Sequence, residues 1–364
     1  MNILKNKAIL AVIMIVLSIL LIAISQSVNM PTSCSSAQKA TPIVREGFYF
    51  DTYVSITVYD KQYEDIVSQC LDICSRYEKI LSRTSSESEL YQLNEALHDN
   101  YTLSYPISDT LYECIEDTLF YSRDFGIKYS ILAGGLSNLW NHKEGKLPDD
   151  STIAEYVDSL HLYTPRLMDK SFQLLSIDDA TNDNLSDANT TIPIVDLGAS
   201  AKGFIADKLY EHMVSNGVTD GIIDLGGNIM VIGDKYDNSG YNIGIKKPFS
   251  SSNEIAAICH ISNLALVTSG VYERYFTVDD KIYHHIIDCE TGYPADNDIL
   301  SVTIICPSAT MADCYSTGCL LLGLNDALDL INSKNNIECV IIDKNYKVHI
   351  SDGLEYKEDY ICLK

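Results

Sequence analysis

The chain has 364 residues, 46% of them apolar, which is enough for one large domain or two ordinary ones with a buried core. Its 50 acidic and 26 basic residues give a formal net charge of -24. This charge repels nucleic-acid phosphates and anionic lipid surfaces, so nucleic-acid binding is excluded as a leading function. An anionic ligand would need local help from backbone N–H groups, a helix N-terminus, a lysine or a bound cation.

The N-terminus has the pattern of a membrane-directed segment. Lys5 and Lys7 precede an uncharged apolar run over residues 8–24, and such a positive flank stays on the cytoplasmic side. Residues 1–26 are therefore predicted to be a signal peptide or a membrane anchor, with the rest of the chain extracytoplasmic at the cell membrane or secreted. A buried core helix is the alternative. Cys34 also allows a lipoprotein, although Pro31 stands where an aliphatic residue is expected.

The eleven cysteines follow no metal-binding pattern. No CxxC pair is accompanied by a second pair or by histidines, so a zinc site is not expected. The number is odd and the chain is too large to need covalent staples. Most of these residues are predicted to be small buried hydrophobic side chains, with one or two disulfides as the alternative.

Hydrophobic periodicity predicts an α+β fold in which an antiparallel sheet is flanked by helices. Residues 47–60 alternate like a strand, and residues 63–81 and 109–125 have helical spacing. A short helix between them is expected to begin at Ser86 or Ser88. Residues 27–44 form a polar linker, and residues 142–190 are rich in turn signals and are interpreted as a surface or a subdomain boundary. From Thr191 onward, short β-rich runs dominate.

Two glycine-containing motifs lie within this β-rich half. In VDLGASAKGFIADKLYEHM a strand is expected to end at Asp196 and a helix to begin in the small-residue turn, where Lys202 supplies a positive charge. Exposed N–H groups there suit a phosphate, but an ordinary strand-to-helix turn explains the pattern equally well. In GIIDLGGNIMVIG, Gly226 and Gly227 are interpreted as a bulge or a hairpin turn, with structure favoured over function.

Residues 267–323 contain the highest density of reactive side chains. VDDK predicts a hairpin turn, which would bring Arg274 and Tyr275 near His284 and His285. Alternation places the two histidines on opposite faces, so that one could act as an acid or a base. In MADCYSTGCLLLG, Asp313 and Thr317 are spaced i, i+4 on one helical face. Such a carboxylate and hydroxyl suit a hard cation, and a capping or solvent-facing aspartate is the alternative.

Four stretches, taken in order, resemble the ApbE family of FAD:protein FMN transferases: DLGASAKGFIADKL (196–209), IIDLGGNI (222–229), TSGVYERYF with YHHIIDCETGYP (268–294) and ADCYSTGCLLLG (312–323). Weaker similarities are FDTYVSI (50–56), SRTSSESELYQLN (82–94) and LSNLWN (136–141). The resemblance implies that residues 45–364 form an ApbE-like, T-fold-related domain with antiparallel sheets flanked by helices.

The resemblance also implies a reaction. FMN would pass from FAD, as substrate, to a Ser or Thr hydroxyl of a target protein with Mg2+ as cofactor and AMP as product. The expected partner is an acceptor protein, such as a membrane redox subunit. The alternatives are a pyrophosphatase that splits FAD into FMN and AMP, an FAD-binding protein without turnover, and a structural surface protein.

The family's site residues carry over position by position. The implied metal ligands are the Ala199 carbonyl, the Asp313 carboxylate and the Thr317 hydroxyl, and the implied base is His285, with Asp313 also catalytic. The implied FAD-binding residues are Asp196, Lys202 and Ile287, together with the less closely matched Phe50, Thr84, Gly126, Ile127 and Lys128.

Several positions depart from the family pattern. Val271 stands where a polar residue is frequent, Cys289 replaces a usual proline, and Lys128 occupies a position where aspartate is common. Two extra residues also precede NLW. These changes affect the expected adenine and ribose contacts more than the metal ligands.

Overall fold

The structure is a computed structural model that describes residues 41–176, 191–235, 239–251, 254–358 and 360–364. The predicted membrane segment, the linker up to residue 40 and Cys34 lie outside these residues. Within the described ranges no helix has both the length and the apolar character needed to cross a membrane.

An eight-stranded sheet forms the centre of the fold, with the strand order β1-β2-β6-β7-β10-β13-β14-β15. Every neighbouring pair in it is antiparallel, which confirms the expected antiparallel sheet. Its strands are β1 Ile43–Tyr49, β2 Thr52–Val58, β6 Gly221–Leu225, β7 Asn228–Ile232, β10 Ala265–Gly270, β13 Ile299–Cys306, β14 Glu338–Asp343 and β15 Val348–Ile350.

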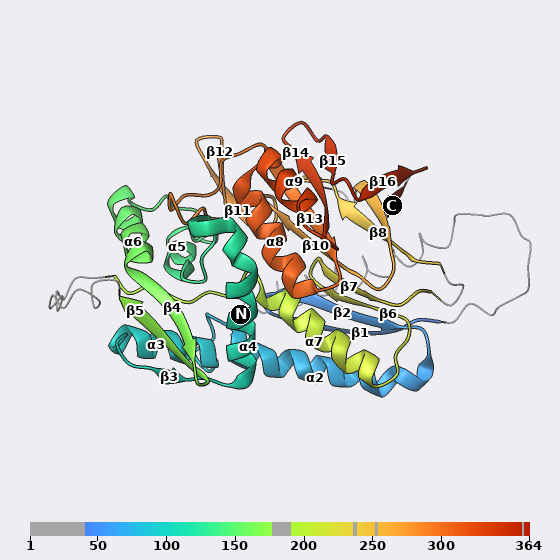
Figure 1. Ribbon diagram of the computed structural model, residues 1–364, viewed down its shortest axis with the longest axis horizontal. Helices are drawn as coiled ribbons and strands as arrows, with labels where there is room; N and C mark the ends of the chain where they lie inside the picture. The colour runs from blue at the N-terminus through green and yellow to red at the C-terminus, as the bar shows by residue number, and fades with distance from the viewer. Residues whose placement is uncertain (1–40, 177–190, 236–238, 252–253, 359) are drawn as a thin grey trace, which may run out of the picture. The chain divides into compact units, whose positions relative to one another are not determined.

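Side chains alternate between two cores across this sheet, as strand geometry requires. Val267 faces the larger core, whereas its neighbour Leu266 faces the smaller one. In Figure 1, α2, α7 and α8 lie across the strands, and their buried faces fill the larger core. The helices of this half are α2 Glu64–Leu81, α7 Ala201–Ser215, α8 Ala309–Leu322 and α9 Leu324–Asn332.

A four-stranded sheet covers the opposite face and encloses the smaller core. Its order is β16-β17-β9-β8, and the β9–β17 pair is parallel. The strands are β8 Tyr241–Lys246, β9 Ile255–Ile261, β16 Leu354–Lys357 and β17 Tyr360–Leu363. A helix layer and two sheets therefore stack around two hydrophobic cores.

Most of the remaining elements lie between α2 and α7 in the chain, and several of them gather at one end of the large sheet (Figure 1). The polar region 142–190 was interpreted as a surface or a subdomain boundary, and its described part, residues 142–176, contains a helix and a β-hairpin. Burial alternates irregularly along residues 142–176, so the periodicity of the sequence is weak there. Residues 177–190 lie outside the described residues. The elements here are β3 Tyr105–Pro106, β4 Tyr163–Met168, β5 Ser171–Ser176, α3 Glu89–Asp99, α4 Asp109–Ser122, the 3-10 segment η2 Arg123–Lys128, α5 Gly134–Leu139 and α6 Asp150–Leu162.

Two local predictions were wrong. Residues 47–60 form a hairpin of β1 and β2 rather than one strand, because Phe50 and Asp51 turn the chain with φ values of 55 and 56. The sequence there lacks the glycine or asparagine that usually marks such a turn. The run ending at Asp196 is also not a strand, since an isolated bridge between Ile194 and Ala133 stands there in place of a continuous ladder among the described residues.

Other predictions are confirmed. The helices begin close to the expected residues, and Ser88 caps α3 by accepting a hydrogen bond from the Tyr91 N–H at 3.2 Å. Gly226 and Gly227 form the turn between β6 and β7. All cysteines in the described ranges are free, and all but the half-buried Cys362 are buried, so they behave as hydrophobic side chains.

Candidate active site

The crossing of α7 and α8 brings the two strongest sequence motifs together. A Cβ on Gly203 would lie 2.2 Å from the Ala309 carbonyl oxygen, so only glycine allows the two helices to approach this closely. The Gly203 N–H, in the first turn of α7, donates to Asp313 Oδ2 on α8 at 2.9 Å. Asp313 is 2% exposed. A carboxylate from one helix therefore caps the N-terminus of the other.

The second oxygen of Asp313 is left available. Oδ1 makes no hydrogen bond among the described residues, and Lys202 Nζ stands 3.8 Å from it. A buried carboxylate with one unbonded oxygen beside a lysine suits a cation bound together with an anionic ligand. Asp313 also has the capping role that the sequence offered as the alternative. Its Oδ2 accepts from the Gly203 N–H at the start of α7, while Oδ1 lies beside Lys202.

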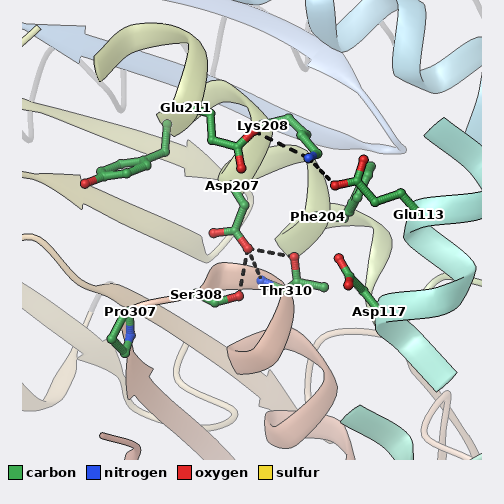
Figure 2. Close-up of a pocket in the computed structure, with 10 residues that line it drawn as sticks. Glu113, Asp117, Phe204, Asp207, Lys208, Glu211, Pro307, Ser308 and Thr310 are labelled. Carbon is green, nitrogen blue, oxygen red and sulfur yellow. Dashed lines mark hydrogen bonds and ion pairs between the residues drawn. The ribbon is translucent and has the colours of Figure 1, made fainter. Parts of the chain in front are cut away.

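Asp207 on α7 fixes the start of α8. Its carboxylate accepts hydrogen bonds from the backbone N–H groups of Ala309 at 2.7 Å and Thr310 at 2.9 Å, and from the Ser308 hydroxyl at 2.8 Å. Figure 2 shows the bonds from Ser308 and Thr310 converging on Asp207. The orientation of α8, and with it the position of Asp313, is therefore set by two carboxylates that bridge the same helices.

A cavity of about 320 Å³ opens beside Asp207. Glu113, Asp117 and Glu211 surround it with only Lys208 as a cation (Figure 2). The pKa of Asp117 is raised, chiefly by burial and then by the charge of Glu113. Such an acidic cavity repels a dinucleotide, and none of the residues expected to bind FAD lines it.

Thr317 lies one turn beyond Asp313 on α8, as its spacing predicts. The hydroxyls of Thr317 and Ser269 are 3.1 Å apart, and Ser269 also lies 2.8 Å from the Ser316 hydroxyl. Ser269 belongs to β10, so the sheet supports the side chain of Thr317. Sequence reasoning missed Ser269, although it lies in the TSG stretch that carried the resemblance.

Ala199 and Asp196 occupy the turn that leads into α7. The Ala199 carbonyl accepts a hydrogen bond from the Tyr129 hydroxyl at 3.2 Å. Asp196 accepts from the Gly198 N–H at 2.8 Å and pairs with Arg83 Nε at 3.0 Å. Arg83 was not predicted as a site residue, but it immediately precedes Thr84 and connects that segment to Asp196.

The hairpin of β11 (Tyr275–Val278) and β12 (Lys281–His284) confirms the predicted VDDK turn. His284 is buried, and both ring nitrogens are used: Nε2 contacts the Ala295 carbonyl at 2.9 Å and Nδ1 accepts from the Ile286 N–H at 3.3 Å. His284 is therefore a structural residue. His285 is only half-buried and has different partners, as the predicted opposite faces require.

His285 has the geometry of a neutral base. Its Nδ1 lies 3.1 Å from the Arg274 carbonyl, which can only accept, so Nδ1 carries the proton and Nε2 keeps its lone pair. Burial is the main cause that lowers the pKa of His285 to about 3, and the nearby charges of Arg274 and Lys202 act in the same direction. Bound phosphate would oppose this shift, because an anion stabilises the protonated imidazole.

An aromatic stack holds the hairpin against α5. The ring of Tyr283 stacks between Phe276 and Trp140, with both centroid distances 5.5 Å. The Trp140 indole N–H donates to the Gly292 carbonyl at 2.7 Å. This stack explains why LSNLWN belongs with the hairpin motif, because Trp140 fixes the strand that leads into His285.

The other predicted FAD-binding residues are more dispersed. Ile287 is 8% exposed and pairs with Pro294 in an isolated bridge. Gly126, which has a φ of 55, and Ile127 precede Lys128 in the chain. Lys128 forms ion pairs with Asp288 at 2.7 Å and Glu290 at 3.0 Å. This pairing places the Lys128 ammonium between two carboxylates.

Phe50 and Thr84 are not joined to the Asp313 cluster by any hydrogen bond or ion pair among the described residues. Phe50 lies in the β1–β2 turn, where its N–H donates to Glu78 Oε1 at 2.8 Å. Thr84 is exposed beside Arg83. The structure therefore places Asp196, Ala199 and Lys202 in and just after the turn into α7, and Asp313 and Thr317 on α8, whereas Phe50 and Thr84 lie in other loops.

The available ligands are oxygen atoms of mixed type. The described ranges contain no group of three or more His, Cys, Asp or Glu side chains arranged to hold a metal ion. One carboxylate, one hydroxyl and one carbonyl instead suit Mg2+, which keeps several waters and binds substrate phosphates. They do not suit zinc, as the cysteine spacing also indicated.

Comparison with known proteins agrees with this fold. The model of the ApbE family matches residues 50–341, and the chain therefore belongs to the ApbE family. It is 28% identical to the FAD:protein FMN transferase of Treponema pallidum, covering 88% of this chain and 90% of that protein. It is 30% identical to the FAD:protein FMN transferase of Klebsiella pneumoniae, covering 79% and 85%.

Solved structures show the same architecture. The ApbE protein of Thermotoga maritima superposes with a TM-score of 0.74 at 25% identity, covering 86% of this chain and 97% of that one. The flavin transferase ApbE of Vibrio cholerae gives a TM-score of 0.69 at 22% identity, covering 86% and 98%. The mixed α+β fold with antiparallel sheets is thus the fold of ApbE proteins.

Proposed function

We propose that this protein is an FAD:protein FMN transferase that uses Mg2+ and modifies a Ser or Thr hydroxyl of an acceptor protein. Family membership and the names of its relatives support the flavin chemistry. The observation that carries the proposal is the buried Asp313 carboxylate, which is held by the Gly203 N–H and has one oxygen left open beside Lys202. A carboxylate so placed needs a cation to be stable next to a diphosphate.

The residues present fit Mg2+. Ala199, Asp313 and Thr317 would hold it through oxygen atoms. The Thr317 and Ser269 hydroxyls are 3.1 Å apart, and a hydrogen bond donated by Thr317 would keep its oxygen lone pairs available. When bound, the ion would neutralise diphosphate charge and assist departure of AMP. Lys202 would bind a phosphate oxygen, which compensates the acidity of the chain as a whole.

His285 would move the proton. The acceptor hydroxyl oxygen attacks the FMN phosphorus, its proton passes to Nε2 of His285, and the bond from that phosphorus to the oxygen of AMP breaks. The Arg274 carbonyl orients the imidazole through Nδ1. The bond formed is a phosphoester between FMN and the protein, and AMP leaves with the electrons of the broken bond.

The side of the membrane on which the reaction occurs is part of the same proposal. Lys5, Lys7 and the apolar run over residues 8–24 support an N-terminal anchor or signal that leaves the catalytic domain on the outer side of the membrane. A membrane redox subunit is the acceptor that this location favours. Protease added to intact cells without a wall should digest the domain, and protection until lysis would contradict this orientation.

The activity is tested by incubating the protein with FAD, Mg2+ and an acceptor domain. The acceptor should gain the mass of one FMN while AMP appears in equal amount. Asp313→Asn keeps an acceptor for the Gly203 N–H but removes the charge, so it should abolish both products. Asp326→Ala, at an exposed aspartate of α9, is the matched control and should behave as wild type.

Other outcomes would refute the proposal in distinct ways. AMP and free FMN without acceptor modification would show a pyrophosphatase. FAD binding without AMP would show a flavin-binding protein. Equal turnover by wild type and Asp313→Asn would remove Asp313 from the reaction.

A further inference from the structure

The side chain of Asn228 is buried without a partner for its amide nitrogen. Asn228 is 2% exposed, and its Nδ2 has no hydrogen-bond partner among the described residues. A buried polar group without a partner destabilises the folded state, so it requires an explanation such as a bound ligand or water. None of the roles assigned above uses Asn228.

Strand register places Asn228 on the helix-covered face of the sheet. Asn228 opens β7 and lies directly opposite Val267 of β10. Residues directly opposite each other in an antiparallel pair point to the same face. Val267 belongs to the larger core, which α7 and α8 cover. The Asn228 amide therefore lies on the same side of the sheet as Lys202 and Asp313.

The same register brings Asn228 close to the proposed metal ligands. Ser269 lies two residues beyond Val267 on β10, so it shares that face and is a diagonal neighbour of Asn228, about 7–8 Å away. Ser269 lies 3.1 Å from the Thr317 hydroxyl. Gly227 precedes Asn228 in the turn between β6 and β7, and a Cβ there would meet no atom within 4 Å, so the turn itself is loosely packed.

We propose that Asn228 is a nucleotide-binding residue, whose Nδ2 donates a hydrogen bond to a diphosphate oxygen of the bound dinucleotide. This inference rests on the proposed function, because Thr317 and Asp313 are the residues that would bring that diphosphate to the first residue of β7. A neutral amide suits the position, since it donates to an anion without pairing with Asp313. Rotation about the terminal torsion, which is broad for asparagine, lets Nδ2 reach the ligand.

The test compares FAD affinity and ligand-free stability in two variants. Asn228→Leu keeps the number and branching of the side-chain heavy atoms and removes the unpaired amide, so the ligand-free melting temperature should stay equal or rise. FAD affinity in the presence of Mg2+, measured by isothermal titration calorimetry, should fall about 10- to 100-fold, the range for a lost hydrogen bond to a charged group. Asn228→Asp should weaken binding further, because it places a second negative charge near the phosphates.

Ser301→Ala is the matched control. Ser301 is 0% exposed, and its hydroxyl is likewise buried without a partner. Its neighbour Val302 faces the larger core, so Ser301 points to the opposite face of the sheet. Removal of this hydroxyl should leave FAD affinity unchanged.

Wild-type FAD affinity in a folded Asn228→Leu protein would overturn the inference and assign the amide to an ordered water instead. If the leucine variant does not fold, wild-type affinity in Asn228→Asp overturns it equally. Failure of the proposed function has a different signature, because the wild-type protein would then bind no FAD or would release no AMP from it.

Discussion

Gly203→Ala should separate α7 from α8 and so disable the site without touching any reacting group. The added Cβ would lie 2.2 Å from the Ala309 carbonyl oxygen and 2.8 Å from Asp313 Cβ. Ordinary contact begins near 3.4 Å, so the helices must move apart by about 1.2 Å. The Gly203 N–H bond to Asp313 lengthens by a similar amount and is lost.

Two magnitudes follow from this displacement. Overpacking of a well-packed helix crossing costs about 1–3 kcal/mol of unfolding free energy. A misplacement of about 1 Å in a catalytic constellation lowers turnover about 100-fold. Ala199 and Asp313 lie on opposite sides of the gap that opens, so Mg2+ affinity should fall as well.

Gly221→Ala separates these effects from general destabilisation. Its Cβ would lie 2.8 Å from the Thr57 carbonyl oxygen, between β2 and β6 and away from α8. Both variants should lose thermal stability, but only Gly203→Ala should lose Mg2+ affinity and FMN transfer when assayed well below its melting temperature. Transfer by folded Gly203→Ala within about threefold of wild type would refute the reasoning, since the 100-fold loss would be absent.

Four further outcomes are expected. His285→Gln should lower FMN transfer by about 100-fold or more at nearly unchanged FAD affinity, as judged by acceptor mass, and an active variant would exclude His285 as the base. The ligand-free protein should lose unfolding free energy as pH falls from about 6.5 toward 3. The folded-state pKa of His285 is lowered to about 3, so in this range the unfolded chain binds a proton that the folded protein does not. In urea titrations His285→Gln should lose less over that range, and parallel curves would contradict this. Arg83→Met leaves the Asp196 carboxylate without its cation and should cost about 1–3 kcal/mol in urea denaturation, with Arg83→Lys recovering only part. Tyr283→Leu removes two ring contacts, worth about 0.5–1.5 kcal/mol each, and should reduce FMN transfer more than FAD binding; equal effects on both would show that the stack does not position His285.

Local sequence patterns were enough to predict how several residues of the candidate site are placed. Asp313 and Thr317 share a helical face because they are four residues apart, and the VDDK turn pairs β11 with β12 because two residues suffice for a hairpin. These are short-range consequences of backbone geometry. Ser88 as a helix cap is of the same kind, since a capping hydroxyl needs only the N–H groups that follow it.

Contacts between residues far apart in the chain left no comparable pattern in the sequence. Arg83 and Asp196 lie far apart in the chain and meet only because the 82–88 loop folds against the turn before α7. The partner of the Tyr129 hydroxyl, the Ala199 carbonyl, is likewise fixed by the packing of η2 on that turn. The hairpin at Phe50 and Asp51 was missed because Phe50 lacks the usual turn preference, although it adopts a positive φ.

The sequence by itself determined the family, the antiparallel α+β class and the chemical types of the site residues, because motif order and local periodicity are properties of the chain. Only the tertiary structure decided which residues meet: Gly203 against Asp313 and Ser269 against Thr317. It also decided that Nδ2 of Asn228 has no partner among the residues that the structure describes. Each of these depends on strand register or helix crossing, in which a shift of one residue would turn the side chain to the opposite face. Such a register is selected by the packing of two cores and is not encoded in any single segment.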